Sequence, residues 1–154
     1  MNYLFRQLAF ARSNTINAVA ELEEEQAEVI ARGFNNHIKW HLGHIYFVQE
    51  RFAFSFIGEE ITLPERLAEL FAPGTRPSEW KGPVPSVGEL TDLLQAQHNK
   101  LVSVLNHRLA EQLPTPYTTS TGLTNATVEE CLSFCLYHEG MHLDAIKALK
   151  RLVG

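Results

Sequence analysis

Two histidines four residues apart are the clearest chemical signal in this sequence. His138 and His142 lie in a stretch with the periodicity of an amphipathic helix. Side chains four apart share one helix face, so the two imidazoles can bind one metal ion. Both histidines belong to one stripe of this predicted helix, which comprises Cys131, Cys135, His138, His142, Ala145, Leu149 and Leu152. The other residues of this seam are apolar or small, which predicts that both rings point into the core. Buried rings need partners, either a metal or specific hydrogen bonds.

An earlier predicted helix carries three more histidines, His37, His41 and His44, along one stripe. One of them can supply a third ligand, and three imidazoles with an open position are typical of a catalytic metal site. His44 is the most enclosed by pattern, since bulky apolar residues occupy the neighbouring turns. His37 is expected near the helix entrance and exposed. The spacing leaves His41 open as a further ligand, as a hydrogen-bond partner of a ligand, or as a packed ring.

The competing interpretation is that these histidines are hydrogen-bonded core residues. That is how we interpret His98 and His107, which stand alone on a third predicted helix. For an inward pair combined with inward histidines on a second helix, the metal interpretation is favoured.

Three more specific metal-binding motifs could explain the histidine pair. His138 to His142 matches the H-E-x-x-H motif of zinc proteases, but no histidine or glutamate follows to supply the third ligand of such an enzyme. A di-iron carboxylate protein needs two Glu-x-x-His motifs, and the chain has one, from Glu139 to His142. Cys135 adds a potential thiolate ligand for a soft ion, although a cysteine in such a seam is more often small core filling.

The elements that must position these residues are predicted to be helices. Periodic apolar residues indicate a helix over about residues 3 to 20 and a shorter helical piece ending near Gly33. Asn35 and Asn36 are natural N-caps for a long helix that reaches Phe56 and stops near Gly58. A segment rich in proline and glycine follows as far as residue 85, with room for a short helix over residues 64–71.

Two capping boxes mark the remaining helices. Ser86 with Glu89 opens a helix that is expected to reach about Leu113, and Thr127 with Glu130 opens the helix of the histidine pair. No strand pattern is evident, only a threonine-rich loop over residues 117–121. The sequence therefore predicts an all-α fold, a four-helix bundle with a long crossover connection, formed as a single domain over residues 1–154.

Composition excludes several classes of partner. The 154 residues are 45% hydrophobic and 20% charged, with a net charge of -5, so no basic face is available for nucleic acid or an anionic membrane. No secretory signal or membrane span is evident, and we expect a cytoplasmic protein. Cys131 and Cys135 lie a helical turn apart in poor geometry for a disulfide and are expected to be reduced thiols.

The two histidine blocks together resemble the DinB/YfiT-like superfamily, a group associated with metalloenzymes. The blocks are Asn35 to Ile45 (NNHIKWHLGHI) and Tyr137 to His142 (YHEGMH), and their order and spacing match over nearly the whole chain. The resemblance implies a four-helix bundle, often dimeric, with a divalent ion, commonly nickel or zinc, on His44, His138 and His142. Where the family pattern often has a glycine two residues after the last ligand, this chain has Asp144.

The resemblance also implies a class of activity. Characterised members join a low-molecular-weight thiol such as bacillithiol or mycothiol to a small-molecule substrate, so we expect a metal-dependent, thiol-using transferase that acts as a homodimer. In such a reaction the ion lowers the pKa of the thiol. The sequence does not choose an acid or base among Glu139, Tyr137 and His41. The alternatives are a metal-dependent hydrolase using bound hydroxide and a non-catalytic metal-binding or stress-related protein.

Overall fold

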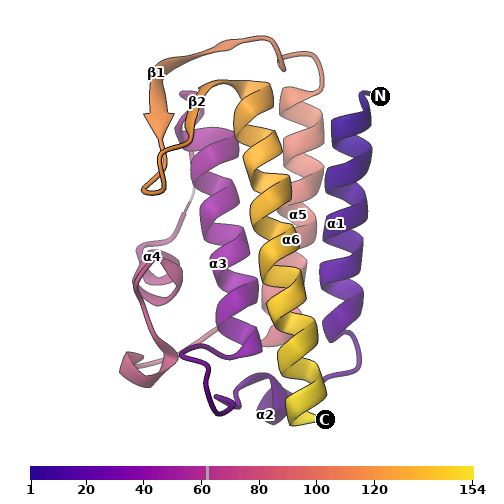
Figure 1. Ribbon diagram of the computed structural model, residues 1–154, viewed down its shortest axis with the longest axis vertical. Helices are drawn as coiled ribbons and strands as arrows, with labels where there is room; N and C mark the ends of the chain where they lie inside the picture. Colours follow the sequence, from indigo (N-terminus) through magenta and orange to yellow (C-terminus); the bar gives the residue numbers. More distant parts are fainter. Residues whose placement is uncertain (62) are drawn as a thin grey trace.

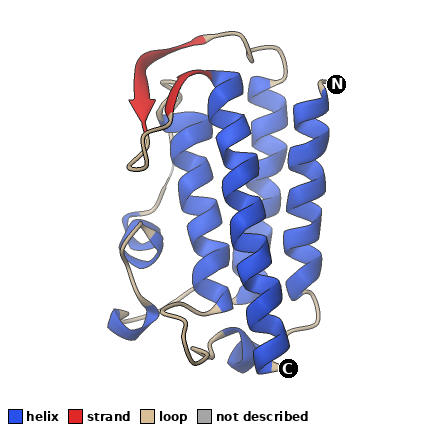
Figure 2. Ribbon diagram, viewed as in Figure 1, coloured by secondary structure: helices blue, strands red, loops and turns tan. Residues whose placement is uncertain are grey.

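The computed structural model describes residues 1–61 and 63–154. Its elements, in chain order, are α1 (Tyr3–Val19), α2 (Glu24–Ala27), α3 (Ile38–Glu50), the π-helix η1 (Arg51–Ser55), α4 (Glu65–Phe71), the 3-10 helix η2 (Pro77–Glu79), α5 (Val87–Leu105), β1 (Gln112–Thr118), β2 (Thr124–Thr127) and α6 (Val128–Val153). The fold is mostly helical, which confirms the predicted class in its broad form (Figure 2).

The long helices α1, α3, α5 and α6 lie side by side and form the body of the molecule (Figure 1). The helix α6 packs against α1 and α3, while α5 packs against the same two helices from the other side. The core between them is built from apolar side chains that are almost entirely buried, among them Phe5, Leu8, Leu42, Ile45, Leu94, Leu101, Leu132 and Ile146. The connection between α3 and α5 carries α4 and η2 outside this body (Figure 1). Within the described residues, no helix is both long enough and apolar enough to cross a membrane.

The two predicted capping boxes are present at the starts of α5 and α6. The Ser86 side chain accepts from the backbone of Glu89, whose carboxylate accepts from the Ser86 backbone in return. Thr127 and Glu130 make the same exchange at the start of α6. These local signals fix the first residue of each helix because they satisfy donors that the helix leaves unpaired.

The N-cap of α3 is His37, so the prediction of Asn35 or Asn36 as the cap was wrong. The His37 ring accepts a hydrogen bond from the Trp40 backbone at 3.1 Å. The side chain is 4% exposed, and the prediction of an exposed His37 was therefore also wrong. Its ring packs edge-on against Trp80 from the crossover, with centroids 5.1 Å apart, and this contact accounts for its burial.

The helix α5 ends at Leu105, well before the predicted end near Leu113. The chain after it turns away because its carbonyl groups cap the next helix: Leu109 and Glu111 accept from the first backbone groups of α6. The expectation of no strands was wrong as well, since β1 and β2 form an antiparallel pair around a turn at Gly122, where φ is +98°. The prolines of β1 are tolerated in this two-stranded sheet, where both strands are edges.

Candidate metal centre

Three of the predicted site histidines come together between α3 and α6. His44 lies on α3, and His138 and His142 lie one turn apart on α6. The Nε2 atom of His138 is 3.3 Å from Nε2 of His44 and 3.1 Å from Nε2 of His142. One ligand atom from each ring lies within 4.8 Å of the others. His44 and His138 are buried and His142 is half-buried, so the three nitrogens converge at the edge of the core.

A backbone carbonyl fixes the tautomer of His44. Its Nδ1 is 2.7 Å from the carbonyl oxygen of Phe71, and because a carbonyl can only accept, Nδ1 carries the proton. In the neutral ring Nε2 then holds a lone pair aimed at the other two histidines. This hydrogen bond is the kind that orients a metal-binding imidazole and raises its basicity.

The approach of α4 that supplies this carbonyl depends on Gly43. A Cβ atom at Gly43 would lie 2.3 Å from the ring of Phe71, closer than any packed carbon can come. The missing side chain lets Phe71 lie against α3, which brings its carbonyl to His44. On the other side, Trp40 stacks on the His44 ring with centroids 4.4 Å apart and an interplanar angle of 13°. The Phe71 carbonyl and the Trp40 ring together hold the His44 ring in place.

Charge and burial keep these rings neutral. Desolvation, together with the neighbouring histidines, lowers the pKa of His138 to about 3 and that of His142 to about 2. Burial also lowers the pKa of His44, against the opposing effect of the Phe71 carbonyl. Near neutral pH the three rings are therefore unprotonated, the form that binds a metal ion.

Two of the three separations between the nitrogens fit a small divalent ion. Metal–nitrogen bonds of about 2.0–2.1 Å in tetrahedral geometry place neighbouring ligand nitrogens about 3.3–3.4 Å apart. The two Nε2 separations of 3.3 and 3.1 Å are close to this value. Three imidazole nitrogens suit zinc, nickel, copper, iron or cobalt, and leave coordination positions open. The residues present therefore fit the group that the sequence predicts.

The structure distinguishes the three roles left open for His41. Its Nδ1 lies 2.8 Å from Nδ1 of His142, on the side of that ring opposite the nitrogen cluster. His41 therefore positions a candidate ligand and is not among the three clustered residues. His37 caps α3, and His98 and His107 lie on and after α5, outside the cluster.

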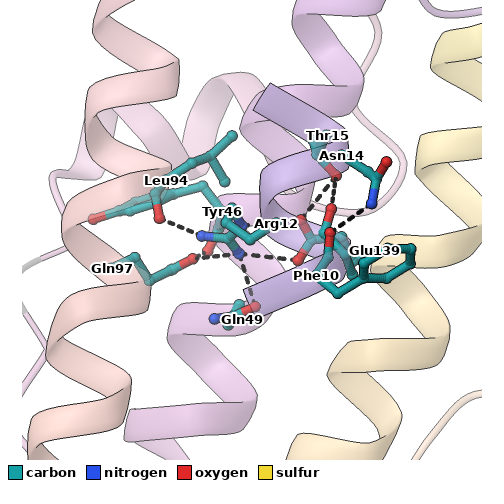
Figure 3. Close-up of polar contacts among 10 residues, drawn as sticks. Phe10, Arg12, Asn14, Thr15, Tyr46, Gln49, Leu94, Gln97 and Glu139 are labelled. Carbon is teal, nitrogen blue, oxygen red and sulfur yellow. Dashed lines mark hydrogen bonds and ion pairs between the residues drawn. The ribbon is translucent and has the colours of Figure 1, made fainter. Parts of the chain in front are cut away.

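Glu139 belongs to a buried polar network that the sequence did not reveal (Figure 3). Its carboxylate binds Arg12 of α1 through two bonds of 2.9 and 3.1 Å and accepts from Thr15 at 2.9 Å. Arg12 also donates to the side chains of Gln49 and Gln97. The ion pair joins residues 127 positions apart, which no local pattern predicts. Because Glu139 is held here, the structure gives it no place as the general base of an H-E-x-x-H protease.

The other sequence candidates lie apart from the nitrogen cluster. Cys131 and Cys135 are free and buried, and burial raises the pKa of both thiols, so neither favours the thiolate form. Within the described residues, the group of potential ligands contains no cysteine. Tyr137 is exposed. The prediction that Leu152 belongs to the inward seam of α6 was wrong, because this side chain is exposed near the C-terminus.

Comparison with known proteins agrees with this architecture. Residues 7–146 match the DinB superfamily. A solved structure, the conserved protein of locus from Enterococcus faecalis, has a similar fold with a TM-score of 0.68 and 18% sequence identity, and the match covers 98% of this chain and 95% of that chain. At this identity the likeness shows the fold alone. No protein with a curated description matches this sequence.

Proposed function

This chain belongs to the DinB superfamily, and on that basis we propose that it binds one divalent ion, nickel or zinc, through His44, His138 and His142, and acts as a thiol-using transferase. The observation that carries the proposal is the convergence of the three rings, with His44 fixed by Phe71 so that its Nε2 faces the others. The packing of α1, α3, α5 and α6 supports the four-helix bundle implied by the family resemblance.

The residues of the chain have separable tasks in this proposal. His44, His138 and His142 hold the ion, and the Phe71 carbonyl and His41 orient two of those rings. Trp40 shields one face of His44 from water. A bound divalent ion would supply a Lewis acid that lowers the pKa of a thiol and favours its attack on an electrophile. The reaction forms a carbon–sulfur bond, breaks the bond to the leaving group and releases the thiol proton.

The test uses bacillithiol or mycothiol with the fluorogenic electrophile monochlorobimane. Metal-loaded protein should accelerate formation of the thioether with loss of chloride, and complete chelation or His142→Ala should abolish the acceleration. His98→Ala is the matched control, since it changes a histidine outside the cluster and should leave the rate unchanged. Turnover that survives chelation would contradict the proposal.

Two further assays separate the two alternative functions from the transferase. A metal-dependent hydrolase would cleave esters or amides in buffer without thiol, because water replaces the thiol as the nucleophile. A non-catalytic metal-binding protein would show no reaction with any of these substrates, while its melting temperature would fall on chelation.

A further inference from the structure

Arg51, the residue that directly follows α3, has no carboxylate partner among the described residues. The arginines that form ion pairs are Arg12, Arg66 and Arg108. The other arginines are exposed to solvent, whereas Arg51 is half-buried. The two acidic residues nearest to it in the sequence are bound elsewhere, since Glu50 accepts from Gln97 and Glu59 pairs with Arg108. The fold thus shields a positive charge without neutralising it.

The guanidinium of Arg51 packs on three aromatic rings. Its Cζ atom lies 5.8 Å from the ring centroid of Phe47 on α3, 5.0 Å from that of Phe56 and 5.9 Å from that of Tyr117 on β1. These cation–π contacts fix the position of the side chain and use none of its five N–H donors. No nitrogen of Arg51 is among the buried, unpaired polar atoms of the described residues, so these donors are open to a ligand.

The π-helix η1 builds this set of rings. The hydrogen bond that closes it runs from the Phe56 backbone N–H to the Arg51 carbonyl, five residues back, at 2.8 Å. In an α-helix a residue five positions on lies on another face. The wider π-turn brings Phe56 onto the side of Arg51, where its ring meets the guanidinium. Turns of this kind are rare and occur frequently at functional sites.

Arg51 also lies on the stripe of α3 that carries His44. The two residues are seven apart, which is about two turns, or about 10 Å along the helix axis. His44 stacks on Trp40 and Arg51 packs on Phe47, each a residue four positions earlier, so both side chains lean toward the start of the helix. The separation between the guanidinium and the His44 ring is therefore also about 10 Å.

On the side of α6, a row of aromatic rings leads from the metal centre to Arg51. The His138 ring stacks on Phe134 with centroids 5.9 Å apart, and Phe134 stacks on Phe52 with centroids 4.4 Å apart. Phe52 contacts Phe56, with centroids 4.9 Å apart, and Phe56 contacts the guanidinium. Phe134 and Phe56 are half-buried, so part of this row is open to the apolar chain of a ligand.

A guanidinium that is held in place but unpaired suits a carboxylate, which it binds through two parallel hydrogen bonds. We propose that Arg51 binds a carboxylate of the thiol substrate, so that the thiol reaches from the three clustered histidines to Arg51. Its chain packs along the row of rings between them. The inference rests on the proposed function, for which it names the class of thiol as one that carries a carboxylate at the end remote from its sulfur.

The experiment titrates three small molecules into isotope-labelled protein and follows the Nε–H signal of Arg51 by nuclear magnetic resonance. Hexanoate should shift this signal saturably, whereas hexanamide, its neutral counterpart, should not. In metal-loaded protein 6-mercaptohexanoate should bind at least about tenfold more tightly than hexanoate, because its sulfur and its carboxylate are held together. In metal-free protein the two acids should bind equally.

Arg51→Gln should weaken the binding of hexanoate about tenfold or more, because hydrogen bonds to a charged group are lost, and should erase the preference over hexanamide. Arg6→Gln is the matched control. Arg6 also packs on an aromatic ring, that of Tyr3, but it is exposed on α1, and this variant should bind both acids as the wild type does.

Three results would overturn the inference: an Arg51 signal that hexanoate does not shift, a preference for hexanoate that survives in Arg51→Gln, or a thiol group that adds no affinity in metal-loaded protein. The wild-type titrations need no variant, so the test stays decisive if Arg51→Gln does not fold. Metal content of the same samples separates the two proposals. A protein that holds its ion and fails the hexanoate test contradicts only the inference, whereas a protein that takes up no ion contradicts the proposed function and with it the inference.

Discussion

The residue that does most to shape the candidate metal centre carries no functional group. Gly43 allows Phe71 to approach α3, and the Phe71 carbonyl then holds the His44 ring in the tautomer that presents Nε2. A glycine inside a helix lowers helix stability by about 1 kcal/mol relative to alanine, so its presence between His41 and His44 has a structural reason.

Gly43→Ala should therefore weaken metal binding although it favours the helix. The new methyl group would displace Phe71 and lengthen the bond from His44, and loss of such an orienting partner typically lowers metal affinity about 10- to 100-fold. Competition with a chromophoric chelator measures the effect. Gly88→Ala is the control, because its added Cβ would meet only ordinary contacts on α5. Equal affinity in the two variants would mean that the Phe71 contact does not orient His44.

At the scale of elements, the start of α3 depends on a side chain that titrates. Burial lowers the pKa of His37 to about 4, and its neutral ring caps the helix by accepting from Trp40. The unfolded chain takes up this proton near pH 6.5 while the folded protein does not, so stability falls as the pH drops from about 6.5 through about 4.

Replacement of His37 by a cap that does not titrate should reduce this acid sensitivity. His37→Asn keeps an N-cap acceptor, and its melting temperature should fall less than that of the wild type between pH 7 and pH 4.5. The wild type loses up to about 1.4 kcal/mol for each pH unit in the window from this one group. Because both proteins retain the three clustered histidines, the difference between their pH profiles isolates the cap. If the melting temperatures of the two proteins fall in parallel, protonation of His37 does not cause the loss of stability in acid.

The same elements show what sequence reasoning can and cannot find. Capping boxes at Ser86 and Thr127 are local, so the starts of α5 and α6 were predicted correctly. The end of α5 and the strand pair depend on contacts between residues 109–111 and the start of α6, which local propensity does not encode. Periodicity predicted an inward pair, His138 and His142, and a third histidine from the earlier helix, and the family resemblance selected His44, which the structure places in the cluster. The Phe71 carbonyl has no side-chain signature.

At the scale of the whole molecule, one buried ion pair ties the helices together behind the candidate metal centre. Arg12 of α1 binds Glu139 of α6 and reaches Gln49 of α3 and the Leu94 carbonyl of α5 (Figure 3). Since Glu139 adjoins His138, the network also fixes the rotation of α6 that turns the histidines toward α3.

Removal of one partner from this network should be far more damaging than removal of both. Arg12→Met leaves the Glu139 carboxylate buried without a counterion, and the free energy of unfolding should fall by about 3–5 kcal/mol. The double variant Arg12→Met, Glu139→Leu should recover much of that loss, because no charge remains buried at the pair. Urea unfolding of both variants measures the difference. A loss below about 1 kcal/mol in the single variant would contradict the assigned importance of the pair.

We propose the outer face of α1 and α6 as the interface of the homodimer that the sequence predicts. Tyr3 and Phe10 on α1 are 65% and 73% exposed, and Met141 on α6 is 48% exposed. Gly140 beside Met141 leaves open space above the helix, which permits close approach by a second copy. Large exposed apolar side chains on adjacent helices are characteristic of protein interfaces.

For the homodimer that the family resemblance implies, we expect Phe10→Glu to convert it to a monomer, because the substitution places a charge in the proposed interface. Light scattering after size-exclusion chromatography measures the mass of each species. Val29→Glu is the control, since Val29 is also exposed but belongs to neither α1 nor α6, and this variant should leave the mass unchanged. A wild-type protein that is monomeric at all concentrations tested would remove the basis for the interface.

The central claim is that His44, His138 and His142 hold a divalent ion, and metal content tests it most directly. Mass spectrometry of untagged protein, purified without chelator, should find close to one ion per chain in the wild type and in His98→Ala, and almost none in His44→Ala and His142→Ala. Absence of metal from the wild type, even after incubation with nickel or zinc, would contradict the claim and leave the three histidines as hydrogen-bonded core residues.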